Sequence, residues 1–350
     1  MSKLKFSTEK ILKILCIKPR GIGDIVLSTI ILDNLKSYFP GVKIDYLTET
    51  FAKDAVEDNP MVNKVLTMDR TEFPLKAAWK IRKEKYDLIL DLWSNPRSAQ
   101  ITFLSGVKYR AGYNYRGRKY AYNILATSER GSNHSAEHNL ELLNAIGVPV
   151  ISKKIHFYLN IDALNFGKEF FKNNFNNDSP IFGIIPSGGW QSKRCDASKW
   201  VEICSAISQK YKAKFLILWG PGDEKDSNYI KDHLKDYCTL APNTTVKQMA
   251  GLIKCCDLVI ANDSGPMHIS AALDIPTLGL FGPTNPLAHG PYSDKSDFIV
   301  RKDLFCINCN KQDCPYHHEC FVDMPVQDVV SKVQVLLERT HNSMKLNENI

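Results

Sequence analysis

The sequence contains no apolar run close to the ~18 residues that a membrane-spanning helix requires. Its apolar stretch near the start, from Ile11 to Ile17, is interrupted by Lys13 and is not followed by the small residues of a cleavage site. The stretch is therefore a poor signal peptide and predicts a first β-strand instead. We expect a cytosolic protein.

Acidic residues are missing over a long segment, since none occurs between Asp91 and Glu129. Interleaved with tyrosines and glycines, this segment carries six cations: Arg97, Lys108, Arg110, Arg116, Arg118 and Lys119. A solvated loop is one interpretation, and a surface for phosphates, carboxylates or sugar rings is the other. Residues 1–180 hold 27 Lys and Arg against 19 Asp and Glu, so we favour an anionic partner for the N-terminal half.

Two common phosphate-binding motifs are also absent. The segment Lys18-Pro-Arg-Gly-Ile-Gly-Asp-Ile-Val ends a predicted strand and opens a helix, but a dinucleotide fingerprint would need glycine in place of Val26. The Gly-Lys-Ser/Thr ending of a P-loop is missing too. What remains is Asp24, in the first turn of a helix at the carboxyl end of a strand, where open α/β sheets bind ligands. A helix-capping carboxylate, worth ~0.5–2 kcal/mol, is the alternative role.

The ten cysteines include four with the spacing Cys306-x2-Cys309-x4-Cys314-x5-Cys320, and this spacing fits no standard zinc motif. A structural disulfide is disfavoured in a cytosolic chain. Metal binding, buried thiols and redox-active thiols remain open for this cluster. We assign no metal ligand and treat the four residues as a candidate structural cluster.

With 350 residues, the chain is long enough for two domains. Short apolar runs alternate with amphipathic stretches, which indicates parallel sheets with helical crossovers. The predicted strands are 14–17, 43–47, 64–66, 87–91, 181–185, 214–219, 238–240, 258–261 and 277–281. We expect an α/β protein with domains over 1–172 and 180–325, a polar linker near 173–180 and a helix over 326–342.

Two further loops carry residues suited to phosphate binding. Ser187, Gly188 and Gly189 follow a predicted strand, allow close approach of a ligand, and precede Lys193. Asp263-Ser264-Gly265-Pro266-Met267-His268 ends another strand and opens a helix, whose first N–H groups could bind an anion. A glycine turn with a solvated basic pair and a structural histidine are the alternative interpretations.

Taken together, these motifs resemble glycosyltransferase family 9, the ADP-heptose:lipopolysaccharide heptosyltransferases. The resemblance covers nearly the whole chain. It includes Gly23-Asp24, Ser187–Lys193, Trp219-Gly220 with the acids after it, Asp263–His268, Phe281-Gly-Pro-Thr-Asn-Pro286 and the late cysteines. It implies a GT-B fold, with two Rossmann-like domains whose parallel sheets face a central cleft and a C-terminal helix that crosses back to the first domain.

The resemblance also implies roles for the residues. Asp24 would be the general base that deprotonates the acceptor hydroxyl. Lys193 and Ser187 would hold the donor diphosphate together with the N–H groups from Gly265 to His268, and Asp263 would lie near the sugar or the acceptor. Asp223 or Glu224 would contact the ribose. The transfer would invert the anomeric centre without a metal or cofactor. Six cations would bind an anionic glycolipid acceptor: Lys18, Arg20, Arg97, Arg116, Arg118 and Lys119.

The sequence departs from the family pattern at two points. Cys195-Asp196 follows Arg194 where the family often has Trp-Pro, and Pro221-Gly222 separates Gly220 from the acids. The donor's base and sugar therefore stay open, although an ADP-sugar is expected. Another nucleotide-sugar transferase and a non-catalytic nucleotide-sugar-binding protein are the alternatives. We expect no nucleic-acid partner, and we expect peripheral contact with the cytoplasmic face of the inner membrane.

Overall fold

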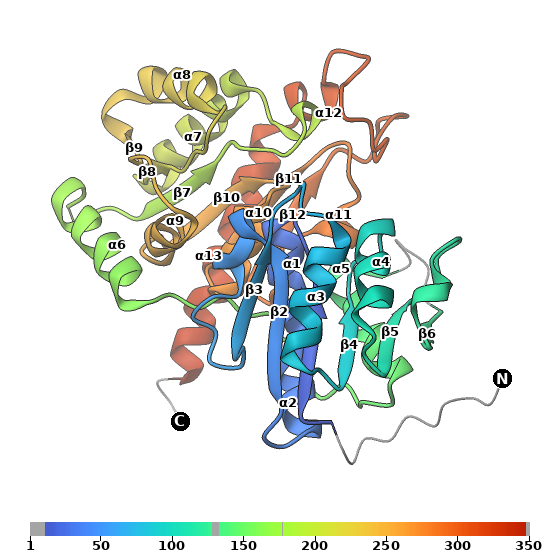
Figure 1. Cartoon of the computed structure of the whole chain (residues 1–350). Coiled ribbons are helices and arrows are strands. Elements are labelled where there is room, and N and C mark those ends of the chain that lie inside the picture. The colour runs from blue at the N-terminus through green and yellow to red at the C-terminus, as the bar shows by residue number, and fades with distance from the viewer. Residues whose placement is uncertain (1–10, 128–132, 177, 348–350) are drawn as a thin grey trace. The chain divides into compact units, whose positions relative to one another are not determined.

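The computed structural model describes residues 11–127, 133–176 and 178–347, with side chains as far as Thr340. The chain divides into two compact units, Met1–Tyr158 and Leu159–Ile350. Each unit contains a six-stranded parallel sheet covered by helices (Figure 1). The predicted α/β architecture is therefore confirmed. No helix in these described ranges is long and apolar enough to cross a bilayer.

The first sheet has the strand order β3-β2-β1-β4-β5-β6. Its strands are β1 (Lys13–Ile17), β2 (Lys43–Glu49), β3 (Lys64–Met68), β4 (Leu88–Asp91), β5 (Tyr109–Tyr113) and β6 (Ile124–Ala126). Its helices are α1 (Ile22–Ser28), η2 (Thr29–Ile31), α2 (Leu32–Tyr38), η3 (Thr50–Ala55), α3 (Pro74–Glu84), α4 (Pro96–Ser105), η4 (Lys119–Ala121) and α5 (Ser135–Ala145). The central strands β1 and β4 are buried, apart from Lys13 at the start of β1, because helices cover both faces of the sheet.

The second sheet has the order β12-β11-β10-β7-β8-β9. Its strands are β7 (Ile181–Ile185), β8 (Lys214–Ile217), β9 (Cys238–Leu240), β10 (Leu258–Asn262), β11 (Thr277–Phe281) and β12 (Ser296–Val300). Its helices are α6 (Ile161–Asn174), η5 (Gln191–Lys193), α7 (Ala197–Tyr211), α8 (Glu224–Leu234), η6 (Lys235–Tyr237), α9 (Val246–Lys254), α10 (Gly265–Ala272), α11 (Pro286–His289), α12 (Glu319–Val322) and α13 (Val326–Asn347).

All nine predicted strands are present, with ends that shift by up to two residues. The sequence did not predict β5, β6 and β12. These three strands give a weak apolar signal, because β5 contains Arg110 and Gly112, β6 has three residues, and β12 is only partly buried at a sheet edge.

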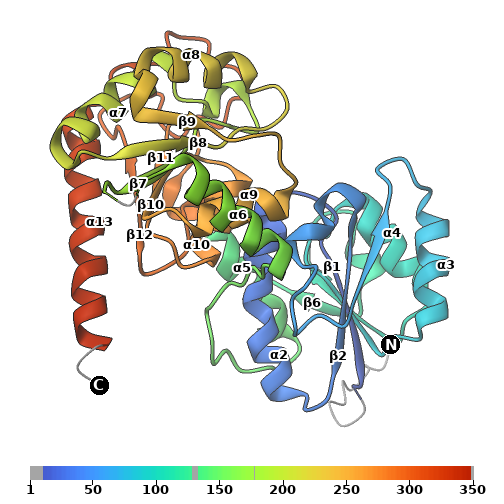
Figure 2. The same ribbon diagram turned by 90° about the vertical axis from the view of Figure 1, so that its left-hand side faces the viewer.

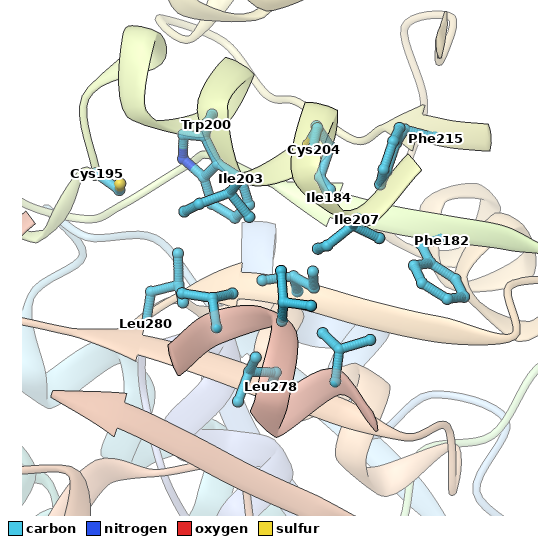
Figure 3. Packing of buried hydrophobic residues seen from close by; sticks show 14 of the residues in the cluster. Phe182, Ile184, Cys195, Trp200, Ile203, Cys204, Ile207, Phe215, Leu278 and Leu280 are labelled. Atoms are coloured by element: carbon cyan, nitrogen blue, oxygen red, sulfur yellow. The ribbon is translucent and has the colours of Figure 1, made fainter. Parts of the chain in front are cut away.

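The core of the second unit lies between its sheet and the helices α7 and α13. Trp200, Ile203 and Ile207 of α7 pack against apolar side chains of β7, β8 and β11 (Figure 3). Val329 and Val333 of α13 are fully buried in the same cluster. The predicted C-terminal helix therefore exists and contributes to the second unit's core. Its crossing back to the first unit stays a prediction.

The division between the units lies after Tyr158, earlier than the predicted boundary at 172–180. The reason is that α6 packs directly against α9 of the second unit (Figure 2). A methyl group added at Gly167 would overlap the carbonyl oxygen of Gly251, and one added at Gly251 would overlap the carbonyl of Ala163. The two helix backbones thus touch through glycines, and the polar segment 173–180 lies within the second unit, with residue 177 outside the described ranges.

This helix contact predicts that Gly251→Ala destabilises the second unit. Inserting a methyl group into a close-packed contact costs roughly 1–3 kcal/mol, so thermal denaturation should show a lower Tm. Gly189→Ala is the matched control, because a methyl group there has no heavy atom within 4 Å. Equal Tm values for the two variants would show that α6 and α9 move apart to admit the methyl group at little cost in stability.

Candidate active site

In each sheet there is one point at which the chain stops placing successive strands on one side and continues on the other side. In the first unit it lies between β1 and β4, and in the second between β7 and β10. Loops that leave neighbouring strands at such a point diverge and leave a ligand-binding crevice at the carboxyl edge. Asp24 follows β1, Ser187 and Lys193 follow β7, and Asp263 follows β10. The candidate residues therefore lie at these two edges.

Asp24 is half-buried in the first turn of α1. The N-cap of this helix is Gly21, whose φ of 82° favours glycine, and a methyl group at Gly21 would overlap the Asp24 carboxylate. Within the described part of the chain, that carboxylate makes no hydrogen bond or ion pair, and no side chain caps the helix start. The capping role is thus not supported, and both carboxylate oxygens are available to a ligand.

Lys193 lies at the carboxyl edge of the second sheet. Its Nζ is 2.6 Å from Oδ2 of Asp263 and 4.5 Å from the centre of the Trp190 ring. The hydroxyl of Thr284 donates to the same Asp263 oxygen at 2.6 Å. Because β7 and β10 are neighbours, residues 70 positions apart in sequence meet here. The ammonium group is held in place, largely out of solvent, by a carboxylate and an aromatic ring.

Asp223 organises the loops beside Lys193. It is buried, and its Oδ2 accepts hydrogen bonds from Ser187 Oγ at 2.6 Å and from the Gly220 N–H at 3.0 Å. Its Oδ1 lies 3.0 Å from Arg194, whose Nε also donates to the Gly188 carbonyl at 3.1 Å. Asp223 and Arg194 therefore hold the glycine loop, residues 187–189, in position through these contacts.

Of the two acids considered for the ribose, only Glu224 is exposed. Its Oε2 accepts a hydrogen bond from the Gly222 N–H at 2.9 Å. Gly189 is exposed and has open space above its Cα, as a close ligand approach requires. The geometry thus separates a positioning acid, Asp223, from an acid that a ligand can reach.

The start of α10 presents a helix N-terminus to the same edge. Ser264 is the N-cap residue with extended backbone, Pro266 occupies the first turn, and the first N–H groups of any helix lack partners within it. The Asn262 amide donates to the Pro186 carbonyl at 2.7 Å, which ties β10 to the end of β7. Met267 and His268 are buried, so they can contribute their backbone N–H groups rather than their side chains.

The predicted acceptor-binding cations fall into two groups. Lys18 is buried and donates to the Leu92 carbonyl at 3.1 Å. Arg97 donates to the carbonyls of residues 69 and 72, and Arg118 to that of residue 94. Through these hydrogen bonds, Lys18, Arg97 and Arg118 hold loops in place at the edge of the first sheet. Arg20, Arg116 and Lys119 are exposed.

A depression of ≈ 350 Å³ lies beside Arg20 at the ends of β2 and β3. Arg70 and the exposed ring of Phe51 line it, together with Glu49, Thr50 and Asp69. Neither Arg70 nor Phe51 was predicted as a site residue. Each lies two residues after the end of a strand, Phe51 after β2 and Arg70 after β3, and this closeness to the carboxyl edge was the signal that could have identified them.

Residues 75–319 match the sequence model of glycosyltransferase family 9 (heptosyltransferase). The chain belongs to glycosyltransferase family 9. It is therefore a transferase, and the predicted family is confirmed.

The relatives of this family 9 transferase match it over nearly its whole length. The lipooligosaccharide heptosyltransferase 2 of Haemophilus influenzae is 26% identical over 94% of this chain and 100% of that protein. The E. coli ADP-heptose lps heptosyltransferase II structure has a TM-score of 0.78 at 21% identity, covering 94% of this chain and 100% of that one. E. coli heptosyltransferase WaaC with ADP has a TM-score of 0.70 at 17% identity, covering 93% and 100%. The GT-B fold class is thus confirmed.

In this family 9 transferase, the late cysteine loop supports the segment that carries Lys193. Ser192 donates from its N–H to the Gln312 carbonyl at 3.1 Å and from its hydroxyl to the Lys311 carbonyl at 2.6 Å. His318 lies 2.9 Å from the Ser192 carbonyl through Nε2 and 3.0 Å from Asp196 through Nδ1. No sequence pattern connects these segments, which lie about 120 residues apart.

The four cysteines of this loop form no disulfide. Within the described ranges no group of three or more His, Cys, Asp or Glu side chains is arranged to hold a metal ion. Burial, reinforced by the three neighbouring thiols, raises the pKa of Cys320 to about 12. This thiol is therefore protonated at neutral pH, and a protonated thiol is a poor nucleophile.

Both partners of His318, a carboxylate and a carbonyl, accept hydrogen bonds, so only the doubly protonated imidazolium satisfies both. Burial lowers the pKa of His318, but the hydrogen bonds to Asp196 and Ser192 outweigh it and raise the pKa above its usual 6.5. A raised folded-state pKa means that the stabilisation is fully present below the unfolded-state value and is lost as pH rises through the folded-state value.

We predict that His318→Asn loosens the loop before Lys193. Asparagine tolerates the left-handed backbone at this position, φ 62°, but cannot bridge both acceptors. Amide hydrogen exchange at Ser192 should accelerate about tenfold, and the loss of Tm relative to the parent protein should be largest below pH ~6.5 and shrink at alkaline pH. His317→Asn, at the exposed neighbouring position, is the control. Unchanged exchange in His318→Asn would contradict the positioning role.

Proposed function

We propose that this family 9 transferase moves heptose from ADP-heptose to the inner core of lipopolysaccharide or a related anionic glycan, with inversion and without a metal. The proposal rests on the different chemical groups that the two sheets present at their carboxyl edges. The first offers an unengaged carboxylate, Asp24, and the second offers a held ammonium, Lys193, beside a helix N-terminus. The heptosyltransferase relatives and the ADP-bound structure named above support the choice of sugar and nucleotide.

In the proposed donor site, the diphosphate lies against the first turn of α10, where N–H groups and the helix dipole favour negative charge. Lys193 completes the site. The diphosphate competes with Asp263 for this ammonium, while Thr284 keeps its hydrogen bond to Asp263. The backbone of Gly188 and Gly189 approaches the phosphates from the other side, and Glu224 accepts hydrogen bonds from the ribose hydroxyls.

In the proposed transfer step, Asp24 removes the proton from the acceptor hydroxyl. The hydroxyl oxygen forms the new bond to the anomeric carbon while the bond from that carbon to the diphosphate oxygen breaks on the opposite face. The configuration therefore inverts. General-base catalysis contributes typically ~10²–10⁴-fold, and the remaining acceleration comes from preorganised charges around the leaving group.

Metal independence is proposed because the chain itself can neutralise the departing diphosphate. Lys193 supplies a full positive charge, and the N-terminus of α10 supplies about half of one. The nearest carboxylate, Asp263, keeps the hydrogen bond from the Thr284 hydroxyl when Lys193 turns to the diphosphate.

The acceptor is proposed to bind the first unit through its exposed cations. Arg20 and Arg70 line one depression. Arg116 and Lys119, on either side of Arg118 in the sequence, are also exposed. Guanidinium groups bind phosphates and carboxylates with two parallel hydrogen bonds. An acidic glycolipid fits this charge better than a neutral sugar.

Asp24→Asn should lower kcat for transfer by roughly 10²–10⁴-fold, because the amide cannot accept the hydroxyl proton. Affinity for ADP should stay within a few-fold, since the diphosphate contacts belong to other residues. Activity is measured as ADP release with a heptose donor and acceptor. Asp162→Asn is the matched control, because Asp162 is an exposed acid in the first turn of α6. Full turnover by Asp24→Asn would remove Asp24 from the role of base.

Calorimetric titration with ADP, UDP, GDP and CDP in EDTA tests the donor site. We expect selective ADP binding, weakened about 10–100-fold in Lys193→Gln, as expected for a lost charged hydrogen bond. Lys225→Gln, at an exposed position on α8, should bind normally. Selectivity for another nucleotide would rule out ADP-heptose as the donor but leave glycosyl transfer as the reaction. A requirement for added divalent metal would contradict metal independence.

A further inference from the structure

The outward face of α3 is apolar where a helix that covers a sheet is normally polar. Leu75 and Trp79, one turn apart, are 59% and 58% exposed, and Phe73 at the N-cap is 78% exposed. The opposite face buries Ala77 and Ile81 against the unit. The exposed side chains are therefore not part of the core.

A shallow groove runs along this face between α3 and α4. It is lined by Phe73, Leu75 and Trp79 of α3 and by Leu104 of α4. The two helices lie side by side (Figure 1). On α4 the ring of Phe103 is also half exposed and meets the exposed ring of Tyr120 edge to face at 5.5 Å. Contiguous exposed apolar surface of this kind marks an interaction site.

Cations border the apolar side chains. On a helical projection Lys76, Arg82 and Lys83 flank Trp79, and the Lys83 ammonium lies 3.3 Å from the centre of the Trp79 ring. Of the cations on this face, Lys76 lies 3.9 Å from Glu72, an acid that is itself mostly buried, while Arg82 and Lys83 make no ion pair within the described part of the chain. Glu72, whose side chain is 5% exposed, pairs with Lys80, and Glu84 pairs with Lys13 and Lys64. The helix α4 contains no acid at all. The face therefore combines aromatic anchors with net positive charge.

We propose that this surface, the α3 face (Phe73, Leu75, Lys76, Trp79, Arg82 and Lys83), docks the first unit onto a lipid bilayer with anionic headgroups. Amphipathic helices with Trp, Phe and Leu on one stripe and Lys or Arg beside it lie in the membrane interface. Each Lys or Arg near an anionic surface adds attraction that falls off within a Debye length.

A bilayer fits the α3 face better than a protein partner does. A stable protein interface needs about 800 Å² and 20–30 residues from each partner, whereas the α3 face consists of six side chains along a single 11-residue helix and its N-cap. Membrane anchoring instead works with a few inserted side chains reinforced by several cations. The face begins three residues after Arg70, which lines the proposed acceptor depression. The inference deepens the proposed function, because the acceptor there is a glycolipid, and it is tested separately.

Sedimentation with phospholipid vesicles tests the proposal. The full chain should bind phosphatidylcholine vesicles containing about one-quarter phosphatidylglycerol and bind pure phosphatidylcholine much more weakly. The double substitution Phe73→Ser with Trp79→Ser should reduce partitioning about tenfold or more. Neutralising Lys76, Arg82 and Lys83 to Gln should weaken binding to the anionic vesicles alone and abolish its salt dependence.

Tyr237→Ser is the matched control, because Tyr237 is similarly exposed at 58% but lies in the second unit. Circular dichroism checks that each variant folds. Equal vesicle binding by parent and variants, or no binding by the parent, would overturn the proposal. A lower oligomer mass of the variants by light scattering without lipid would assign the face to self-association instead.

Transfer to a water-soluble, delipidated acceptor separates this inference from the proposed function. The α3-face variants should retain the parent's rate on that acceptor and lose rate only with acceptor embedded in vesicles. Loss of rate on both acceptors would place the α3 face in the catalytic machinery and overturn membrane docking as its role. Vesicle binding by a chain that shows no transfer would leave docking intact and reject the proposed function.

Discussion

The ion pair between Lys193 and Asp263 joins the ends of two neighbouring strands at the edge of the second sheet. It places an ammonium group beside the start of α10, where we propose that the chain's own charges hold a diphosphate. The parallel pairing of β7 with β10 makes the contact, because parallel strands carry their carboxyl ends to one edge. Without that pairing, the glycine loop after β7 and the start of α10 would not lie at the same edge of the sheet.

Around this ion pair, several residues position others rather than meet a ligand. Asp223 and Arg194 hold the glycine loop, and the loop that contains His318 holds Ser192, next to Lys193. The late cysteine segment, conspicuous for its thiols, acts in the described structure through backbone carbonyls and a histidine. The first unit shows the same division, because Lys18, Arg97 and Arg118 brace loops while Arg20 stays exposed.

Much of the fold and of the candidate site was predictable from sequence. Buried parallel strands are largely continuous apolar runs, so β1 and β7 stood out, whereas the edge strand β12 begins with two polar residues, is only partly buried and did not. The motifs after the strands identified Asp24, Lys193 and Asp263 because residue type and strand position coincide there. The domain boundary was misplaced because the segment 173–180 has the composition of a linker, and only the glycine contact between α6 and α9 assigns α6 to the second unit.

By itself, the sequence determined the fold class, the family and the edge residues, because apolar periodicity and local motifs are properties of neighbouring residues. Only the tertiary structure decided which charges are engaged with one another. It separated buried Asp223 from exposed Glu224, and it showed Asp24 unengaged. It also showed that Glu84 of α3 pairs with Lys13 and Lys64, away from the exposed apolar side chains of that helix. Such pairings join residues tens of positions apart, and their distances depend on packing that no local pattern encodes.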